Sequence, residues 1–336
     1  MKKLFYIFSL ISFVLLSACE NQDWSFPDYG KTSVYFAYQY PLRTIVLGND
    51  ETFDNTLDNQ HKCIIKATMG GVYNNGTNPT VDITVDNSLC DNWNFKDGGK
   101  VVAMPADYYK LSSDKIVIKE GQISGGVEVQ LTDAFFADPK SIETTYVIPL
   151  VMSNVQNADS ILSGVPSVEN PVRGVISDWN VAPKDYILYA VKYVNPWDGV
   201  YLRRGTDLFT KGGTTSTIVR HNQYVEKDEV CEFTTLSLNK AQWAWKAGKN
   251  TWNLILTFNE NNECSLSSDT PGCKVSGSGK YVEKGEKNSF NHKDRDVLYL
   301  DYTVDLDSVM YVTKDTLVMR DRQVKPEWFD VVREEL

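Results

Sequence analysis

Flat aromatic side chains are the residues of this sequence whose type and spacing most clearly suggest a chemical role. Five of them fall within one stretch of the second half of the chain: Trp197, Tyr201, Trp243, Trp245 and Trp252. Such rings can stack on the C–H faces of sugars, and they provide rigid contact area at low entropic cost. Asn239, Gln242 and Asn250 lie near them in the sequence and could bind sugar hydroxyls. The cluster therefore indicates a glycan-binding site.

Two short motifs would set the directions of these rings. Residues 195–199 (NPWDG) are typical of a turn, which could hold Trp197 at the rim of a barrel. In an extended segment Trp243 and Trp245 would share one face, because side chains alternate along a strand. The same rings could instead fill the interior of a barrel and close its ends, and the sequence leaves both alternatives open.

The sequence contains no pattern that predicts catalysis. HExxH, GxSxG and GxGxxG are absent, and the three histidines are far apart. Residues 276–280 (SGSGK) lack the features of a phosphate loop and are interpreted as a flexible turn. Asp301, Asp305 and Asp307 alternate with apolar residues like the solvated face of a strand, and they match no calcium loop. We expect no catalytic residues, no metal site and no cofactor, with an unrecognised carboxylate pair of a glycoside hydrolase as an alternative.

Composition and charge exclude one class of partner. The 336 residues include 34 Lys and Arg against 44 Asp and Glu, which gives a formal net charge of −10. A negative chain without a basic cluster is a poor nucleic-acid binder, because phosphate contacts need basic side chains. Nucleic acid is therefore not an expected partner.

The N-terminus has the features of an export signal. Lys2 and Lys3 precede an apolar run over 4–16, which is shorter than the roughly 20 residues of a transmembrane helix. The segment 16–19 (LSAC) resembles a bacterial lipobox, and this resemblance implies cleavage before Cys19 and lipidation of that residue. We therefore expect a signal peptide at 1–18, a lipidated tether at 19–31 and attachment to the membrane. An ordinary signal peptide or a short anchor helix is the alternative.

The rest of the chain has the pattern of short strands. Val81, Ile83 and Val85 alternate with polar residues, and 115–121 with 126–131 is typical of a hairpin. Pro149 interrupts the segment 145–152, which predicts an edge or a bulge there. Prolines and glycines break the pattern over 156–184, so we expect a linker between a β-sandwich at 32–155 and a second domain at 185–336. About eight strand-like segments in that second domain predict an antiparallel β-barrel.

The cysteines leave several pairings open. Cys19 apart, the chain has Cys63, Cys90, Cys231, Cys264 and Cys273, an odd number. Export would permit disulfides between Cys63 and Cys90 and between Cys264 and Cys273. The alternative is that all five remain reduced.

Three segments of the first half resemble a Bacteroidetes lipoprotein domain of unknown function: 40–48 (YPLRTIVLG), 105–109 (PADYY) with the KIVIKEG segment after it, and 146–150 (YVIPL). The resemblance implies an immunoglobulin-like sandwich, which often forms the N-terminal domain of surface glycan-binding proteins and precedes the catalytic barrel in some family-eighteen endoglycosidases. Residues 195–205 (NPWDGVYLRRG) resemble the lipocalin-like C-terminal domains found with it. The alternating strands and helices of a catalytic barrel, which take about 250 residues, are absent.

Together these features predict an all-β protein, with an immunoglobulin-like sandwich followed by a lipocalin-like antiparallel barrel. The expected function is non-catalytic glycan binding by an outer-membrane lipoprotein exposed at the cell surface. The resemblance also implies a glycan-utilisation system and a TonB-dependent importer as a partner. The main alternative is an adhesin or structural surface protein that binds a protein partner through a strand edge.

Overall fold

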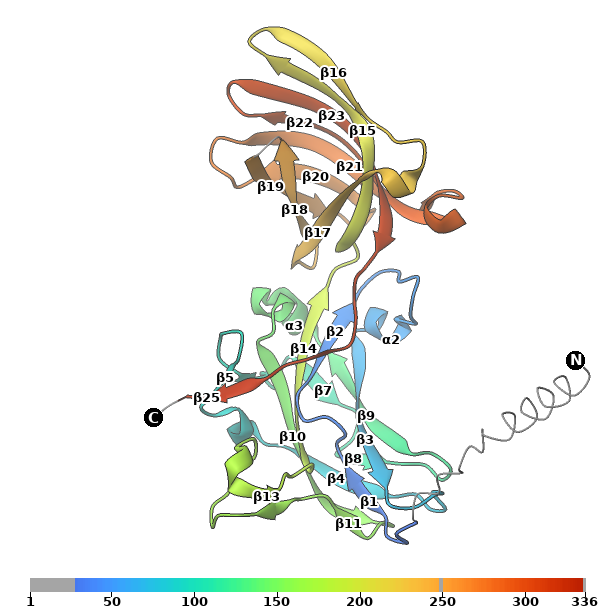
Figure 1. Cartoon of the computed structure of the whole chain (residues 1–336), viewed down its shortest axis with the longest axis vertical. Helices are drawn as coiled ribbons and strands as arrows, with labels where there is room; N and C mark the ends of the chain where they lie inside the picture. The colour runs from blue at the N-terminus through green and yellow to red at the C-terminus, as the bar shows by residue number, and fades with distance from the viewer. Residues whose placement is uncertain (1–27, 248–249, 335–336) are drawn as a thin grey trace, which may run out of the picture.

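Strands dominate the structure, a computed structural model that describes residues 28–247 and 250–334. Figure 1 shows a β-sandwich below and a β-barrel above it. Among the described residues the α-helices are two short ones, α2 (Thr56–Asn59) and α3 (Asp133–Ala137). None of the helices in these ranges is long and apolar enough to cross a membrane. The expected signal peptide, Cys19 and the first part of the tether lie outside the described residues.

The lower unit consists of two facing sheets. The first has the order β11 (Ser160–Ile161), β1 (Ser33–Tyr35), β3 (Lys62–Gly70), β9 (Ser124–Leu131) and β7 (Tyr109–Leu111). The second has the order β24 (Glu327–Trp328), β2 (Pro41–Val46), β14 (Tyr186–Val194), β10 (Tyr146–Gln156), β4 (Thr80–Val85) and β8 (Lys115–Val117). A further short strand, β6 (Val102–Ala103), pairs with β10.

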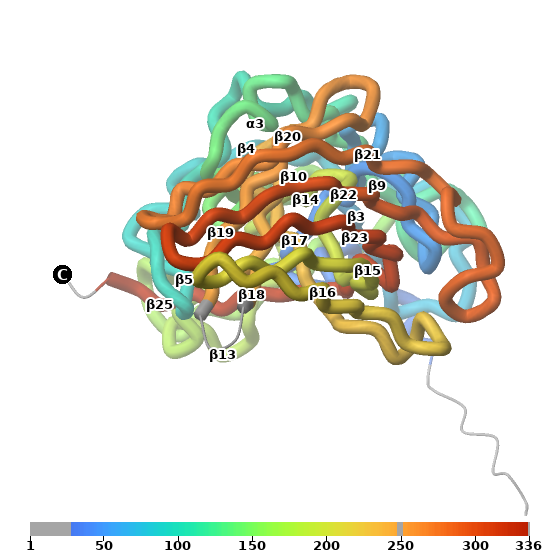
Figure 2. The backbone as a smooth tube through the Cα atoms, turned by 90° about the horizontal axis from the view of Figure 1, so that it is seen from above, coloured from blue at the N-terminus to red at the C-terminus, as the bar shows by residue number. Residues whose placement is uncertain are grey.

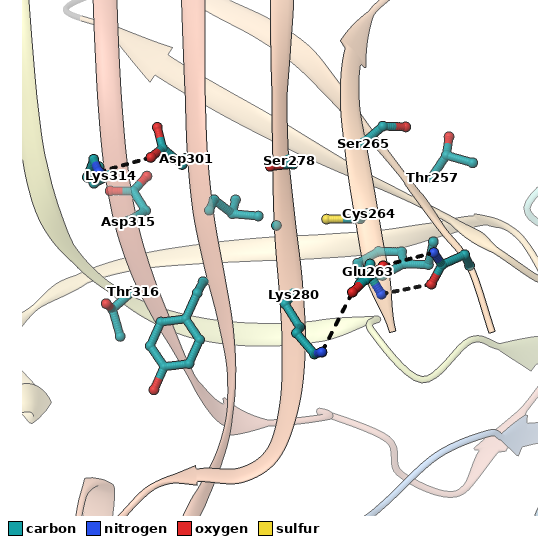
Figure 3. A pocket seen from close by; sticks show the side chains of 15 residues that line it. Thr257, Glu263, Cys264, Ser265, Ser278, Lys280, Asp301, Lys314, Asp315 and Thr316 are labelled. Atoms are coloured by element: carbon teal, nitrogen blue, oxygen red, sulfur yellow. Dashed lines mark hydrogen bonds and ion pairs between the residues drawn. The ribbon is translucent and has the colours of Figure 1, made fainter. Parts of the chain in front are cut away.

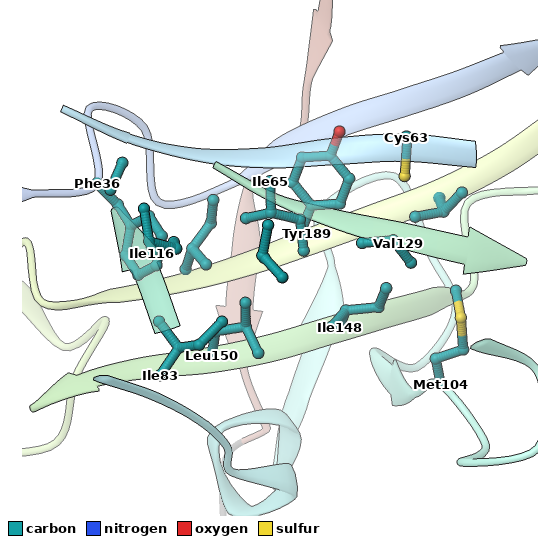
Figure 4. Close-up of a cluster of buried hydrophobic side chains, with 14 of the residues drawn as sticks. Phe36, Cys63, Ile65, Ile83, Met104, Ile116, Val129, Ile148, Leu150 and Tyr189 are labelled. Atoms are coloured by element: carbon teal, nitrogen blue, oxygen red, sulfur yellow. The ribbon is translucent and has the colours of Figure 1, made fainter. Parts of the chain in front are cut away.

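Alternating side chains build the core between these sheets. Ile148 and Leu150 of β10 pack inside with Ile65 and Val129 of the facing sheet (Figure 4). Val147, the neighbour of Ile148, belongs to a separate apolar cluster. Because strand residues alternate between faces, this second cluster shows that the β10 sheet is covered on both sides.

The outer cluster is covered by short elements. A two-stranded sheet joins β5 (Trp93–Phe95) to β25 (Val331–Arg333), and Phe329 is buried beside it. A second small sheet joins β12 (Val165–Pro166) to β13 (Trp179–Val181). Residues 329–333, although they follow the barrel in the sequence, therefore belong to the lower unit.

The upper unit is an eight-stranded antiparallel barrel. Its members are β15 (Gly199–Lys211), β17 (Glu229–Ser237), β18 (Lys240–Ala247), β19 (Asn250–Phe258), β20 (Glu263–Ser268), β21 (Lys274–Glu286), β22 (Arg295–Asp305) and β23 (Val309–Asp321). Pairing of β15 with β23 closes the barrel, and β16 (Thr214–Arg220) adds an outer strand that pairs with β15 (Figure 2). The predicted fold class, a sandwich followed by a barrel, is confirmed.

The structure corrects the predicted domain limits. The segment 156–184 is not a free linker, because β11 pairs with β1 and β12 pairs with β13. β14, which the sequence analysis placed in the barrel domain at 185–336, lies between β10 and β2 in the sandwich sheet. Its run of apolar residues is explained by this central position, since both of its faces are buried.

The predicted hairpin at 115–131 is also wrong. β8 pairs with β4 in one sheet, whereas β9 pairs with β3 and β7 in the other. The intervening residues cross from one sheet to the other. A Cβ at Gly125 would lie 2.0 Å from the Val117 carbonyl oxygen, so the two segments approach closely without pairing.

A buried arginine joins the two units. The chain crosses between them twice, at 195–198 and at 322–326. Arg322 donates to the carbonyl oxygens of Leu47 at 3.0 Å and Asn195 at 2.6 Å. It thereby ties a loop of the sandwich to both crossings.

An ionic network lies inside the barrel. Arg203 Nε and Tyr302 Oη donate to Asp315 Oδ2 at 2.9 and 2.8 Å. Arg220 of β16 pairs with both Asp315 and Asp207. Arg203 and Asp315 are only 2% and 3% exposed, so each charge depends on its partners for compensation.

Replacing Asp315 with Ala should therefore strongly destabilise the barrel, by about 3–5 kcal/mol in the free energy of unfolding. The change removes the buried carboxylate from Arg203, which keeps only the partly exposed Glu229, and removes one of the two Asp partners of Arg220. The matched control is Asp301→Ala on β22, which breaks an exposed pair with Lys314 of 3.0 Å. That control should cost less than about 1 kcal/mol. Urea unfolding of both variants measures the difference, and equal losses would contradict this account of the network.

Candidate functional site

The aromatic side chains singled out from the sequence lie in the barrel interior. Trp197, Tyr201, Trp243 and Trp245 are 6%, 0%, 2% and 2% exposed, and Trp252 is half-buried against the same cluster. Trp243 and Trp245 do share one face of β18, but that face points inward. This placement favours the alternative in which the rings fill the barrel.

Ring packing explains why these side chains are buried. Trp197 stacks on Phe258 with ring centroids 3.8 Å apart, and Trp243 stacks on Phe233 at 5.3 Å. The indole nitrogens of Trp197 and Trp245 have no hydrogen-bond partner within the described ranges. The packing of these five residues is that of a hydrophobic core. Glycan binding by them stays a prediction.

The best-formed exposed site lies where the end of the chain passes over the sandwich. Residues 322–330, here called the strap, leave the barrel and pair through β24 with β2, so that Trp328 lies opposite Pro41. A cleft of about 570 Å³ is lined by residues of both β2 and the strap and is called the strap cleft. Its walls include Tyr38 and Phe53 from the sandwich and Trp328 from the strap.

Two exposed rings form one side of the strap cleft. Tyr38 is 59% exposed and Trp328 is 56% exposed, and their centroids lie 5.6 Å apart at an interplanar angle of 52°. Exposed neighbouring rings are unusual because burial would normally stabilise them. They present two flat apolar faces to a ligand in water.

Charged groups with fixed positions lie beside these rings. Arg43 pairs with the fully buried Asp58, which also accepts a hydrogen bond from the Val46 N–H at 3.0 Å. Burial raises the pKa of Asp58, although Arg43 opposes the shift. Arg43 therefore keeps a defined orientation in the wall of the cleft.

Glu327 is held in a similar way. Its carboxylate pairs with Lys192 at 3.0 Å and accepts a hydrogen bond from Thr44 Oγ1 at 3.3 Å. Among the residues that line the strap cleft, it is the one carboxylate. The cleft thus combines apolar faces with hydrogen-bond donors and acceptors, which suits a polyhydroxylated ligand.

Sequence reasoning missed this site because its two rings are 290 positions apart (328 − 38). They meet only through the pairing of β24 with β2. A local signal was present at 327–329 (EWF), since neighbouring residues of a strand face opposite sides. Phe329 is indeed 9% exposed and Trp328 is 56% exposed.

A second depression lies on the barrel wall over β19 to β23, with a volume of about 970 Å³ (Figure 3). Ser278, Gly279 and Lys280 line it. The whole segment 276–280 (SGSGK) forms part of strand β21 rather than the flexible turn expected from the sequence. Lys280 pairs with Glu263 at 3.7 Å, and Lys314 pairs with Asp301. These pairs are exposed, as on an ordinary solvated surface.

No reactive cysteine or metal cluster occurs in the described ranges. All five cysteines there are buried and free, so neither disulfide considered from the sequence is formed. Burial raises the pKa of Cys63, Cys90 and Cys264 to about 12. Within 28–247 and 250–334, no group of three or more His, Cys, Asp or Glu side chains could hold a metal ion.

Comparisons with known proteins find a solved structure that is similar over most of the chain. A Bacteroides ovatus protein of unknown function shares 53% identity over 90% of this chain and 99% of its own, with a TM-score of 0.86. Residues 196–323 match a domain of unknown function, DUF5627, and residues 29–159 match a model described only as an N-terminal domain. The second match begins at residue 196, just before the first barrel strand, and residues 160–195 lie outside both matches.

Other solved structures are much more distant. A second Bacteroides ovatus protein of unknown function is 12% identical over 89% of this chain and 100% of its own, with a TM-score of 0.41. An auxiliary nutrient binding protein from Bacteroides thetaiotaomicron is 13% identical over 85% of this chain and 95% of its own, with a TM-score of 0.34. Likeness at this level carries no argument about function. No curated protein matches the sequence.

The buried thiols predict a dependence of stability on pH. A thiol has a pKa of about 8.5 in the unfolded chain, whereas that of Cys63 is raised to about 12 by burial. The unfolded chain therefore loses thiol protons first, and the stabilisation is complete below about pH 8.5 and declines as the pH rises towards 12. Urea unfolding of a Cys19→Ala variant should give a constant free energy from pH 6 to 8 and a lower one by pH 9.5.

A thiol reagent provides the control. At pH 8 the native variant should leave all five thiols unreacted, and the urea-unfolded variant should react at all five. Fast labelling of any native thiol would contradict the burial on which the pH dependence rests.

Proposed function

The chain belongs to the same family as the Bacteroides ovatus protein of unknown function, and we propose that it is a non-catalytic surface lipoprotein that binds glycan. The observation that carries this proposal is the exposed Tyr38–Trp328 pair in the strap cleft. The site therefore differs from the barrel aromatics that the sequence first suggested.

The chemistry of the cleft matches that of a sugar. Pyranose rings have apolar C–H faces that stack on aromatic rings. The planes of Tyr38 and Trp328 are inclined to each other by 52°, so each ring could stack on one of two successive sugar units. Arg43 donates and Glu327 accepts, so together they complement hydroxyl groups, which do both. Because both side chains are already oriented by ion pairs, little rotamer entropy would be lost on binding.

The same residues support binding without catalysis. Glycoside hydrolysis commonly needs two carboxyl groups about 5–9 Å apart, whereas Glu327 is the single carboxylate lining the cleft. Lys192 and Thr44 bind that carboxylate through an ion pair and a hydrogen bond. The hydrolase alternative therefore has no support at this site.

The proposed location follows from the N-terminal sequence. The lipobox-like 16–19 (LSAC) supports lipidation of Cys19 and attachment to the outer membrane, with the folded body outside the cell. A TonB-dependent importer, implied by the family resemblance, would take up the bound glycan. A protein of this kind would concentrate polysaccharide at the surface without changing it.

One observation favours the protein-binding alternative. β16 forms the free edge of the barrel sheet, pairs only with β15 within the described ranges, and is exposed over most of its seven residues. A bare edge of this length can accept a strand from another protein. Together with the buried indoles, it supports an adhesin as the second candidate function.

Substituting Trp328 with Ala should weaken glycan binding without changing the melting temperature, because the ring is more than half exposed. Loss of one stacked indole costs about 1–2 kcal/mol, which corresponds to a roughly 5- to 30-fold lower affinity. A glycan array with the Cys19→Ala body identifies the ligand, and calorimetry then compares Trp328→Ala with wild type.

Trp243→Ala is the matched control for this measurement. Its ring is 2% exposed, so its loss should cost about 3–5 kcal/mol of stability. If Trp243→Ala remains stable and loses binding while Trp328→Ala binds normally, the site lies in the barrel. An array with no signal would favour the adhesin.

The lipid anchor is tested by Cys19→Ala. This change removes the residue that would carry the acyl chains, so the protein should move from the membrane fraction to the soluble fraction. Fractionation with immunodetection measures the shift. A variant that remains in the membrane fraction after signal cleavage would contradict lipidation at Cys19.

A further inference from the structure

Three large side chains are exposed together at one end of the sandwich. Tyr29, Tyr73 and Ile123 are 74%, 60% and 72% exposed. Hydrogen bonds hold their backbones beside one another, because the Tyr29 N–H donates to the Gly71 carbonyl at 3.1 Å and the Tyr73 N–H donates to Asp28 at 3.3 Å. The Ile123 carbonyl accepts two hydrogen bonds from the adjacent end of β3.

This end of the molecule lies opposite the barrel. β1 and β11 are at the bottom of Figure 1, and the end of β3 pairs with the start of β1 there. The described chain also begins at this end, with Asp28 and Tyr29. Only the eight residues 20–27 separate it from Cys19, and a chain of that length spans at most about 30 Å.

We propose that Tyr29, Tyr73 and Ile123 form a membrane footing, a patch that rests in the headgroup region of the lipid bilayer. The inference depends on the lipid anchor of the proposed function, which would bring this end of the sandwich to the membrane. Tyrosine rings favour the membrane–water interface, where the ring is desolvated and the hydroxyl remains hydrated. Ile123 would gain from the removal of its apolar surface from water.

A weak contact is sufficient in this arrangement. Three side chains alone would bind a bilayer only transiently, but attachment at Cys19 makes the contact intramolecular and raises its effective concentration. The footing would then fix the orientation of a body that the tether alone leaves free. The barrel would point away from the lipid, with the strap cleft above the membrane surface.

Site-specific fluorescence tests the footing in the full-length lipidated protein. A fluorophore at Ile123→Cys is compared with one at Val219→Cys, an exposed position (65%) on β16 of the barrel. The five native thiols of the folded body are buried, so the introduced thiol is labelled selectively. The protein is reconstituted into vesicles of phosphatidylethanolamine and phosphatidylglycerol that contain a headgroup-linked nitroxide quencher.

The expected result is several-fold stronger quenching at position 123 than at position 219, and a reduction towards the level of position 219 when Tyr29→Ser and Tyr73→Ser are added. Melting temperature and glycan binding should not change, since all three side chains are exposed and remote from the cleft. Equal weak quenching at both positions, in protein that sediments with the vesicles, overturns the footing and leaves the anchor intact. Protein that does not sediment overturns the anchor and the footing with it.

Discussion

The placement of the barrel relative to the sandwich depends on the buried guanidinium of Arg322. It is 7% exposed and donates to the carbonyl oxygens of Leu47, Asn49 and Asn195. A buried cation requires such compensation, because desolvation without partners would cost several kcal/mol. The three carbonyls come from the sandwich loop and the first crossing, so one side chain fixes both connections between the units.

Close packing around Arg322 leaves little freedom for hinge motion. Gly48 adopts a φ of +84°, and a Cβ there would lie 2.7 Å from the Cβ of Pro196. A side chain at position 48 would therefore separate the loop from the crossing. The strap begins at Arg322. The contacts of Arg322 with Leu47 and Asn195 therefore set the direction in which the strap leaves the barrel, and hence the position of Trp328.

The alternation of apolar and polar residues, together with the positions of proline and glycine, was sufficient to predict the all-β class and the two units. They could not predict which strand joins which sheet, because pairing depends on residues far apart in the sequence. β14 is an example: its apolar run identifies a buried strand, yet the sandwich and the barrel would each explain it. The domain limits were wrong for this reason.

Pro149 shows a second limit of the sequence pattern. A proline predicts an edge or a bulge because it has no N–H to donate, whereas β10 is a central strand. On the side that Pro149 faces, pairing with β6 ends at Val147 and pairing with β4 begins at Leu150. The missing donor falls in this gap, which depends on two strands whose pairing the sequence does not specify. The candidate site was hidden in the same way, since Tyr38 and Trp328 approach only in the folded chain.

The strap also imposes an order on folding. β24 supplies the outermost strand of the sandwich sheet, and Phe329 fills the apolar cluster on its outer face. Until residue 329 has been synthesised, the sheet ends in a bare β2 edge and the cluster is exposed to water. Such surfaces favour aggregation. The sandwich is therefore synthesised first but completed last. The final strand of its second sheet, β24, follows the barrel in the sequence, so the sandwich cannot finish folding until the barrel has been synthesised.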